Sequence, residues 1–225
     1  MDGNSKKYYA AYDERYKTAH KKGFSWSSPQ STPIVMEVIR KYRLDRAQTI
    51  LEVGCGEGRD ARTVFENGYS LTATDLSEEA IRYCKETMPQ YTSRFRVLDC
   101  LSQEMEETFD FIYSVAVIHM LVPDSDRRGF YQFIGNHLSQ TGVALICSMG
   151  DGHIETQTDT REAFALRERE HESGKMMVAA TSCRMVSFPT FEAELQQNHL
   201  KILEKGITDA SPNFNSLMYA VVQKE

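Results

Sequence analysis

The sequence of 225 residues predicts an α/β protein whose parallel sheet is covered by helices on both faces. Between residues 49 and 148, short apolar segments typical of strands alternate with amphipathic segments typical of helices. A glycine-rich turn directly follows the first of these strands, at residues 54–58. Near the end of the chain, two strand-like segments follow one another with no helix between them, which favours an antiparallel pair.

The first 42 residues predict two helices separated by a break. Residues 4–22 place a stripe of aromatic residues at helical spacing among lysines, and residues 22–29 then contain Gly23 and Pro29, which interrupt a helix. A second helix is expected to start with Thr32 as its cap and Pro33 in its first turn. Its apolar positions form one face: Ile34, Val35, Val38, Ile39 and Tyr42.

The alternating region predicts five strands, at residues 49–53, 70–75, 94–98, 110–117 and 143–148. Three helices are expected between them. The first follows the glycine turn, the second starts at Ser77, and the third opens at Pro123-Asp124. Strands separated by amphipathic helices indicate a parallel sheet buried on both faces.

The regular alternation stops at residue 150. Residues 150–187 predict a polar helix, because Asp159 to Glu162 resembles a capping box, followed by Gly174 and a short apolar stretch. We expect this segment to be a lid or substrate insertion over the edge of the sheet. A helix at 190–198 and strands at 200–205 and 216–223 complete the chain. The prediction is a single domain over 1–225, with residues 1–30 as an N-terminal arm.

Composition narrows the functional classes. The formal net charge is −6 and the pI is near 5.6, which disfavours a surface built for nucleic acid. The 5 cysteines show no CxxC spacing, so neither a zinc site nor a disulfide framework is expected, and no metal is predicted. The start of the chain lacks an apolar leader core and no apolar run reaches transmembrane length, so we expect a cytoplasmic protein that does not act on membranes.

The glycine turn predicts a ligand at the carboxyl end of the first strand. Gly54, Gly56 and Gly58 give the pattern GxGxG, and Glu52 lies two residues before the first glycine. A dinucleotide site has its third glycine one position later, and a P-loop has a lysine after the turn. An acidic residue beside pyrophosphate is unfavourable. The turn therefore favours a ligand that is not polyanionic.

Two further acids end the next two strands of the prediction. Asp75 is placed to accept hydrogen bonds from the two hydroxyls of a ribose. Asp99 is placed to accept one from an adenine amino group, with Cys100 or Leu101 against the ring. An aspartate after a strand is also common as a helix cap or turn residue. The order of all three features, rather than any one of them, predicts an adenosine site.

With these features the sequence resembles the class I S-adenosylmethionine-dependent methyltransferases, from about residue 33 to the end. The segment Phe109-Asp110-Phe111-Ile112-Tyr113-Ser114 is similar to the fourth-strand motif, which borders the methionine part of the cofactor. The resemblance implies a Rossmann-like sheet of seven strands in the order 3-2-1-4-5-7-6, with the last strand antiparallel. It implies S-adenosylmethionine as cofactor, held by Trp26, Glu52, Gly54, Cys55, Gly56, Gly58, Arg59, Asp75, Leu76, Asp99, Cys100 and Ser114.

A narrower similarity points to methyltransferases of small molecules, namely the tellurite-resistance and thiopurine enzymes. It is carried by Tyr-Tyr-x-x-Tyr-Asp-x-Arg-Tyr at residues 8–16, by Trp26 and Pro29, and by Gly-Glu-Gly-Arg-Asp at residues 56–60. This similarity implies that Trp26 lies near the methionine end of the cofactor and that Arg59 lies near its carboxylate or the substrate. Packing of a helix is the alternative explanation for the tyrosines.

The catalytic residues are less visible in the sequence, because methyl transfer from a sulfonium relies on positioning and desolvation. His119, after the fourth strand, is the candidate for orienting the acceptor or taking its proton, with a structural role as the alternative. Arg184 is a candidate clamp for a substrate carboxylate or a partner in a surface ion pair. The fourth strand lacks the Asn/Asp-Pro-Pro-Tyr motif and the chain lacks a Pro-Cys pair.

These absences favour a small-molecule acceptor at O, N or S over nucleic acid. We expect the protein to be a monomer or a homodimer. Two alternatives remain open from the sequence. The first is an NAD-dependent Rossmann oxidoreductase, which shares the glycine turn and the ribose acid. The second is a methyltransferase-like module that binds the cofactor without turnover.

Overall fold

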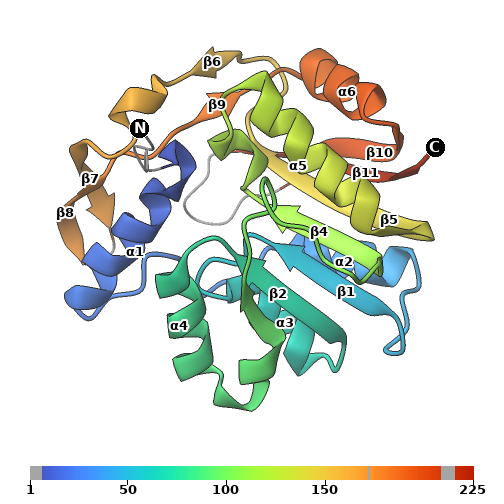
Figure 1. The fold of residues 1–225 in the computed structure, drawn as a ribbon, viewed down its shortest axis with the longest axis horizontal. Helices are drawn as coiled ribbons and strands as arrows, with labels where there is room; N and C mark the ends of the chain where they lie inside the picture. Colours follow the sequence, from blue (N-terminus) through green and yellow to red (C-terminus); the bar gives the residue numbers. More distant parts are fainter. Residues whose placement is uncertain (1–6, 172, 209–215) are drawn as a thin grey trace, which may run out of the picture.

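The fold is described from a computed structural model, which places residues 7–171, 173–208 and 216–225. Its centre is a sheet of seven strands in the order β10-β11-β5-β4-β1-β2-β3 (Figure 1). All neighbouring pairs are parallel except those made by β11, which is antiparallel to both β5 and β10. Numbered along the predicted strands, this is the order 3-2-1-4-5-7-6, and the predicted fold class is confirmed.

The strands of this sheet are bounded as follows: β1 Thr49–Val53, β2 Ser70–Asp75, β3 Phe95–Val97, β4 Phe109–Val115, β5 Leu138–Met149, β10 Leu200–Thr208 and β11 Leu217–Lys224. The predicted bounds of β1 and β2 are exact. Strand β4 ends at Val115, two residues earlier than predicted, because Ala116 turns into the left-handed region with a φ of 60°.

Helices cover both faces of the sheet. Helices α2 Pro33–Lys41, α3 Arg59–Glu66 and α4 Glu78–Thr87 pack into the apolar core on one face. Helices α5 Asp124–His137 and α6 Phe188–Gln197 pack into the core on the other. Short 3-10 segments occur at η1 Tyr8–Ala10, η2 Pro89–Arg94, η3 Ile118–Met120 and η4 Thr160–Glu162. This two-sided cover leaves the carboxyl ends of the strands as the open edge.

Two predicted helix caps have different outcomes. The Ser77 hydroxyl accepts a hydrogen bond of 3.0 Å from the backbone N–H of Ala80, so Ser77 caps α4 as predicted. Thr32 lies at the start of α2 but makes no capping bond with its side chain. Thr32 therefore occupies the predicted N-cap position, while its hydroxyl is oriented toward Asp60, to which it donates at 3.1 Å.

The polar helix predicted within residues 150–187 is also wrong. The described residues form η4 and four short strands: β6 Thr156–Gln157, β7 Leu166–His171, β8 Gly174–Ala179 and β9 Arg184–Met185. Strands β7 and β8 make an antiparallel hairpin. Met176 and Val178 of β8 are buried in a small cluster with Ala19 and Trp26. Tertiary packing therefore overrides the helix-forming composition of this segment.

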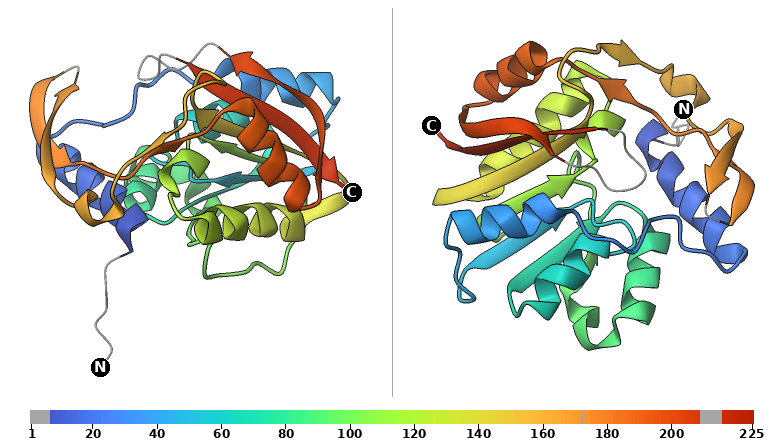
Figure 2. Two further views of the ribbon diagram at one scale, coloured as in Figure 1. Left: turned by 90° about the horizontal axis from the view of Figure 1, so that it is seen from above. Right: turned by 180° about the vertical axis from the view of Figure 1, so that it is seen from behind.

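The N-terminal arm crosses the open edge of the sheet. Helix α1 Ala11–Lys21 lies between the hairpin β7-β8 on one side and α4 on the other (Figures 1 and 2). Residues 4–6 of the predicted helix lie outside the described residues. Tyr16 and Ala19 are buried as the aromatic stripe predicted, whereas Tyr8, Tyr9 and Tyr12 are only partly buried. Part of the aromatic stripe of the arm therefore faces the open edge at the carboxyl ends of the strands.

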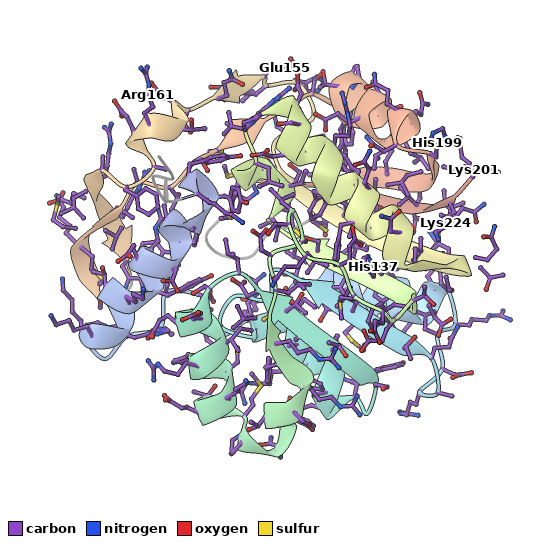
Figure 3. All side chains as sticks on the ribbon, in the orientation of Figure 1. His137, Glu155, Arg161, His199, Lys201 and Lys224 are labelled. Atoms are coloured by element: carbon purple, nitrogen blue, oxygen red, sulfur yellow. The ribbon has the colours of Figure 1, made fainter. Side chains whose placement is uncertain are left out.

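The outer surface carries polar side chains together with exposed apolar ones such as Leu166 and Met177. Arg161 in the insertion and His199 and Lys201 near α6 project away from the ribbon (Figure 3). Within the described ranges, none of the helices is both long and apolar enough to cross a membrane.

Candidate functional site

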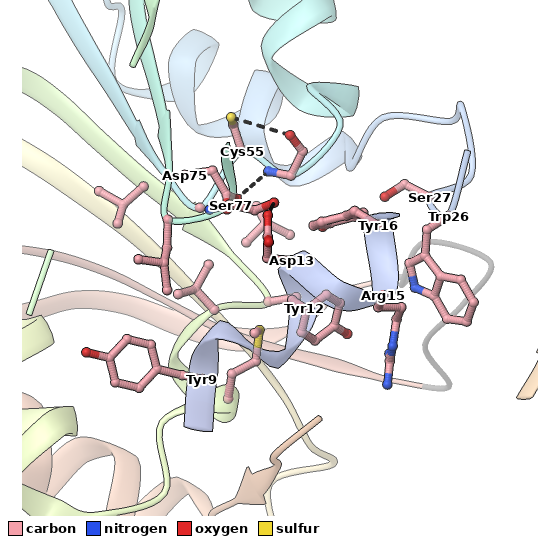
Figure 4. A pocket seen from close by; sticks show the side chains of 18 of the residues that line it. Tyr9, Tyr12, Asp13, Arg15, Tyr16, Trp26, Ser27, Cys55, Asp75 and Ser77 are labelled. Carbon is pink, nitrogen blue, oxygen red and sulfur yellow. Dashed lines mark hydrogen bonds between the residues drawn. The ribbon is translucent and has the colours of Figure 1, made fainter. Parts of the chain in front are cut away.

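A cavity of about 440 Å³ lies at the carboxyl edge of the sheet, beneath the arm (Figure 4). Four parts of the chain line it: the glycine turn after β1, the ends of β2, β3 and β4, the arm with residues 26–28, and residues 169–171 of β7. This volume is typical of a small-molecule site. The carboxyl edge of a parallel sheet is also the usual place for a ligand in such folds.

The glycine turn is shaped so that the backbone faces this cavity. Gly54 and Gly56 have φ angles of 79° and 53°, which residues with a side chain rarely adopt. A Cβ atom on Gly54 would lie 2.2 Å from Cγ2 of Val117, and one on Gly56 would lie 2.7 Å from the hydroxyl of Tyr16. The two glycines are thus required by both conformation and space. They allow β4 and the arm to approach the turn closely.

Asp75, at the end of β2, is bound to the turn. Its two carboxylate oxygens accept hydrogen bonds from the backbone N–H groups of Gly56, at 2.7 Å, and Ser77, at 2.8 Å. Burial raises the pKa of Asp75 to about 6 against the lowering effect of these two bonds. Each carboxylate oxygen has a second lone pair, so Asp75 retains acceptor capacity toward the cavity that it lines.

Asp99 lies after β3 and is 6% exposed. It accepts hydrogen bonds from the backbone N–H of Leu101 at 3.0 Å and from the hydroxyls of Ser102 at 2.8 Å and Tyr9 at 3.3 Å, and it pairs with Lys7. Burial alone would raise the pKa of Asp99, but these donors outweigh burial and lower it. Asp99 is therefore anchored to the arm as well as to its own loop.

Glu52 is an acid buried within the sheet, 2% exposed, beside the cavity. It accepts a hydrogen bond of 3.0 Å from the hydroxyl of Tyr113. Burial, and then the nearby charge of Asp60, raise the pKa of Glu52 well above its ordinary value. Arg59 donates to the hydroxyl of Thr32 at 2.7 Å and pairs with Asp60 at 3.0 Å, and it lines the same end of the cavity.

Glu57, between two glycines of the turn, holds the arm. It accepts hydrogen bonds from the backbone N–H groups of Trp26, at 2.7 Å, and Ser27, at 2.5 Å. His20 lies 2.7 Å from Glu57 and 2.7 Å from Glu79 of α4. The turn, the arm and α4 are thus joined through one imidazole and two carboxylates.

Comparison with known proteins matches the part of the chain that contains the glycine turn to a protein family. Residues 50–142 match the family model described as a methyltransferase domain. The chain is 28% identical over 134 residues to a malonyl-[acyl-carrier protein] O-methyltransferase of Bacillus anthracis, which covers 58% of this chain and 47% of that protein.

The chain is similar to the class I S-adenosylmethionine-dependent methyltransferases. It is also 26% identical over 115 residues to the probable S-adenosyl-L-methionine-dependent methyltransferase TehB of Haemophilus influenzae, covering 50% of this chain and 39% of that protein. The chain thus spans less than half the length of these two curated methyltransferases.

A solved methyltransferase shows the same fold over the full chain. It is the 1,6-didemethyltoxoflavin-N1-methyltransferase of Burkholderia thailandensis, with bound 1,6-didemethyltoxoflavin and S-adenosylhomocysteine. The TM-score is 0.72 at 16% identity, over 100% of this chain and 93% of that one. A likeness at this identity extends to the fold, including the arm and the insertion.

The donor set fits S-adenosylmethionine, the cofactor of the proteins that the chain resembles. Strands β1, β2 and β3 are neighbours in the sheet, so the turn, Asp75 and Asp99 at their carboxyl ends follow the order expected for methionine, ribose and adenine. The acids Glu52, Asp60, Asp75 and Asp99 lie along the sheet side of the cavity, which suits a ligand that carries a positive sulfonium. Among the described residues, no group of three or more histidine, cysteine, aspartate or glutamate side chains is arranged to hold a metal ion.

The structure brings most of the sequence-predicted site residues to the cavity: Trp26, Glu52, Gly54, Cys55, Gly56, Arg59, Asp75, Leu76, Asp99 and Cys100. Three others lie outside its lining. Gly58 packs against Cys84 and Met88, the Ser114 hydroxyl donates to the carbonyl of Val53, and His119 is 4% exposed. Arg184 pairs with Asp124 at 2.6 Å on the surface, which was the alternative considered for it.

Sequence reasoning missed several residues that the fold brings to the cavity, above all Asp13, Arg15 and Arg169. Asp13 accepts a hydrogen bond of 2.6 Å from the hydroxyl of Ser77 and so fixes the first turn of α1 above the end of β2. Arg15 belongs to the tyrosine-rich motif of the arm, so its position carried a signal. Arg169 lies in the segment wrongly predicted as a helix, so its position carried none.

Proposed function

We propose that this chain binds S-adenosylmethionine and transfers its methyl group to an O, N or S atom of a small molecule. The observation that carries this proposal is a single cavity along which the glycine turn, Asp75 and Asp99 line the sheet side, while the arm and β7 cover the other side. One side therefore suits the cofactor, and the other side leaves room for an acceptor that varies between members of the family.

The residues of the chain would hold the cofactor in the following way. Asp75, already oriented by the N–H groups of Gly56 and Ser77, accepts hydrogen bonds from the ribose hydroxyls. Asp99 accepts one from the adenine amino group, while Leu98, Cys100 and Leu101 line the wall for the ring. Arg59 and Trp26 lie at the end of the cavity near the glycine turn, where the methionine part belongs.

The bound cofactor supplies a methyl group that is already activated by a positively charged sulfur. The chain's own contribution is to position the acceptor and exclude water from the reacting atoms, which is sufficient for an in-line displacement. Tyr9, Tyr12 and Tyr16 of the arm line the cavity and provide apolar cover. The arm and residues 150–187 would then complete one domain with the sheet, and the insertion would face the acceptor.

Two solved structures with this fold support an acceptor smaller than a protein, although the curated relative of Bacillus anthracis is named for malonyl-[acyl-carrier protein]. The toxoflavin-type enzyme has a heterocyclic small molecule bound beside S-adenosylhomocysteine. The glycopeptide N-methyltransferase MtfA, with a TM-score of 0.64, is a further neighbour with bound cofactor. The first likeness covers 100% of this chain, including the arm and the insertion, and the second covers 89%.

The proposal is tested by comparing cofactors. S-adenosylhomocysteine is expected to raise the melting temperature of the protein and to bind in a calorimeter, whereas NAD is expected to do neither. A response to NAD alone would assign the chain to the oxidoreductases. Incubation with methyl-labelled cofactor and panels of thiols, amines and phenols then separates an enzyme from a cofactor-binding module, since a module transfers no label to any of them.

A further inference from the structure

The cavity has a second, basic end, which shares only Trp26 with the residues proposed to hold the cofactor. It is formed by Tyr12 and Arg15 of α1, by Trp26, and by Arg169 and His171 of β7, which we call the basic end. Figure 4 shows Arg15 and Trp26 side by side, on the far side of the drawing from Asp75. The inference drawn from this end rests on the proposed function and concerns the acceptor.

Arg15 is the central residue of the basic end. It is 5% exposed, and its guanidinium carbon lies 4.6 Å from the ring centre of Tyr12 and 4.9 Å from that of Trp26. Its Nε and Nη2 donate to the carbonyl of Ala179, at 3.1 and 2.6 Å, and Nη2 also donates to the carbonyl of Ala180 at 2.7 Å. These bonds fix the guanidinium plane between two aromatic rings.

The charge of Arg15 has no acidic partner in the described part of the chain. The hydrogen bonds of its guanidinium come from Nε and Nη2 and go to neutral oxygens, and none of those within that part is donated by Nη1. A buried cation without a carboxylate is costly to keep in an apolar site. The cost is reduced when an anion binds beside it, which points to a ligand group that brings the negative charge.

Arg169 adds a second positive charge to the same end. It lies two residues before His171 on β7, so both side chains are on one face of the strand. The His171 ring stacks on Trp26, with ring centres 5.4 Å apart. The positive charge of Arg169 acts with burial to lower the pKa of Arg15. Glu170 is the acid at this end, so two guanidinium groups stand against one carboxylate.

The two ends of the cavity are therefore opposite in charge. The sheet side presents Glu52, Asp60, Asp75 and Asp99 against Arg59, and Asp13 of the arm lies on this side at Ser77. The basic end presents Arg15 and Arg169 against Glu170. A cationic cofactor is favoured on the first side and an anion on the second. We propose that the methyl acceptor is a small molecule carrying a carboxylate, which Arg15 binds through Nη1 with Arg169 beside it.

Trp26 provides the readout for a test, because it is the only tryptophan in the chain and lies against Arg15. The probes are pairs of hydroxybenzoates, aminobenzoates and mercaptoalkanoates with their amides, titrated in the presence of saturating S-adenosylhomocysteine. At least one acid is expected to quench Trp26 fluorescence with an affinity about tenfold or more above that of its amide, the scale of one charge-assisted hydrogen bond.

Three variants assign the preference to the basic end. Arg15→Met and Arg169→Gln are both expected to reduce the preference for acid over amide. In Arg15→Met the preference should fall to about twofold or less, whereas Arg15→Lys should retain part of it. Arg169 is exposed, so its substitution tests the inference even where Arg15→Met folds poorly. Arg167→Gln is the matched control, since Arg167 lies on the same strand and pairs with Glu162 away from the cavity.

Three results would overturn the inference. The first is a panel in which no acid binds more tightly than its amide. The second is an equal loss of acid and amide binding in both Arg15→Met and Arg169→Gln, which would indicate a purely structural role. The third is weaker binding of S-adenosylhomocysteine to Arg15→Met with unchanged binding of 5′-methylthioadenosine, which would place the cofactor's own carboxylate at Arg15. Failure of S-adenosylhomocysteine to bind the unmodified protein would instead refute the proposed function.

Discussion

The carboxylate of Asp75 accepts a hydrogen bond of 2.7 Å from the backbone N–H of Gly56, which joins the end of β2 to the glycine turn. Asp75→Ala removes this bond and the proposed acceptor of the ribose hydroxyls. We expect the binding free energy of S-adenosylhomocysteine to weaken by about 1–3 kcal/mol, measured by calorimetry. Glu78→Ala, an exposed acid at the start of α4, is the control. Unchanged affinity in a folded Asp75→Ala variant would remove the ribose assignment.

The same residue predicts how cofactor binding depends on pH. Burial raises the pKa of Asp75 to about 6 in the ligand-free protein, and only the ionised form accepts from both hydroxyls. The affinity for S-adenosylhomocysteine should therefore rise as pH increases through about 6, and below that value fall about tenfold per pH unit. Asp75→Ala should flatten this profile. Glu52→Gln separates any contribution of Glu52, whose pKa burial also raises.

Gly54→Ala tests the close packing of the turn. The new Cβ atom would lie 2.2 Å from Val117 at a φ of 79°, so both contact and conformation are unfavourable. We expect a loss of about 1–3 kcal/mol in the free energy of unfolding, measured in urea. Gly135→Ala in α5 is the matched control, because a Cβ there meets no atom within 4 Å. It should be neutral or stabilise by up to about 1 kcal/mol. Equal stability of the two variants would contradict the geometry of the turn.

The imidazole that joins the arm to the turn predicts a second pH dependence, this time of stability. Burial lowers the pKa of His20, but its hydrogen bonds to Glu57 and Glu79 outweigh burial and raise it. A raised folded pKa gives stability that is complete below the unfolded value of about 6.5 and is lost as pH rises through the folded value. Urea unfolding between pH 6 and 9 should show this loss. His20→Gln should remove it, and His153→Gln, at an exposed histidine, should not.

His119 was the histidine predicted as a base, yet it is 4% exposed and lies outside the cavity lining. Burial and then the charge of Arg127 lower its pKa to about 4, so the ring is neutral at pH 7. We expect His119→Gln to lower stability while kcat, measured with any acceptor found in the panels, changes by less than about threefold, well below the effect of losing a general base. A fall of a hundredfold or more with a shifted pH–rate profile would restore the catalytic role.

The parallel part of the fold could be predicted because local pattern and tertiary packing agree there. Strands β1 and β2 begin at polar residues and continue into buried apolar ones, so their bounds were exact. The insertion was mispredicted for the opposite reason. The segment Leu-Arg-Glu-Arg-Glu of β7 consists of good helix formers, and its pairing with β8 depends on Met176 and Val178 packing against the arm.

The candidate site divides in the same way. Residues at strand ends, such as Asp75 and Asp99, were visible because their distance from the glycine turn is fixed by the fold. Glu57 was not singled out, because its partners Trp26 and Ser27 lie about 30 residues upstream, and single sequences carry no signal for such pairing. Arg169 was missed because its segment was wrongly predicted to be a helix. The residues that we propose for the cofactor can thus be found from local sequence patterns. Those that we propose for the acceptor are brought to the site by long-range contacts.

The hairpin β7-β8 enters the chain between β5 and α6 and reaches the site only where it meets the arm. It contributes no strand to the seven-stranded sheet. Selection for a new acceptor could therefore change the sequence of this hairpin while the sheet keeps the residues that we propose to face adenosine. The same separation offers a route to engineering, in which hairpins from related enzymes are grafted here and screened for new substrates.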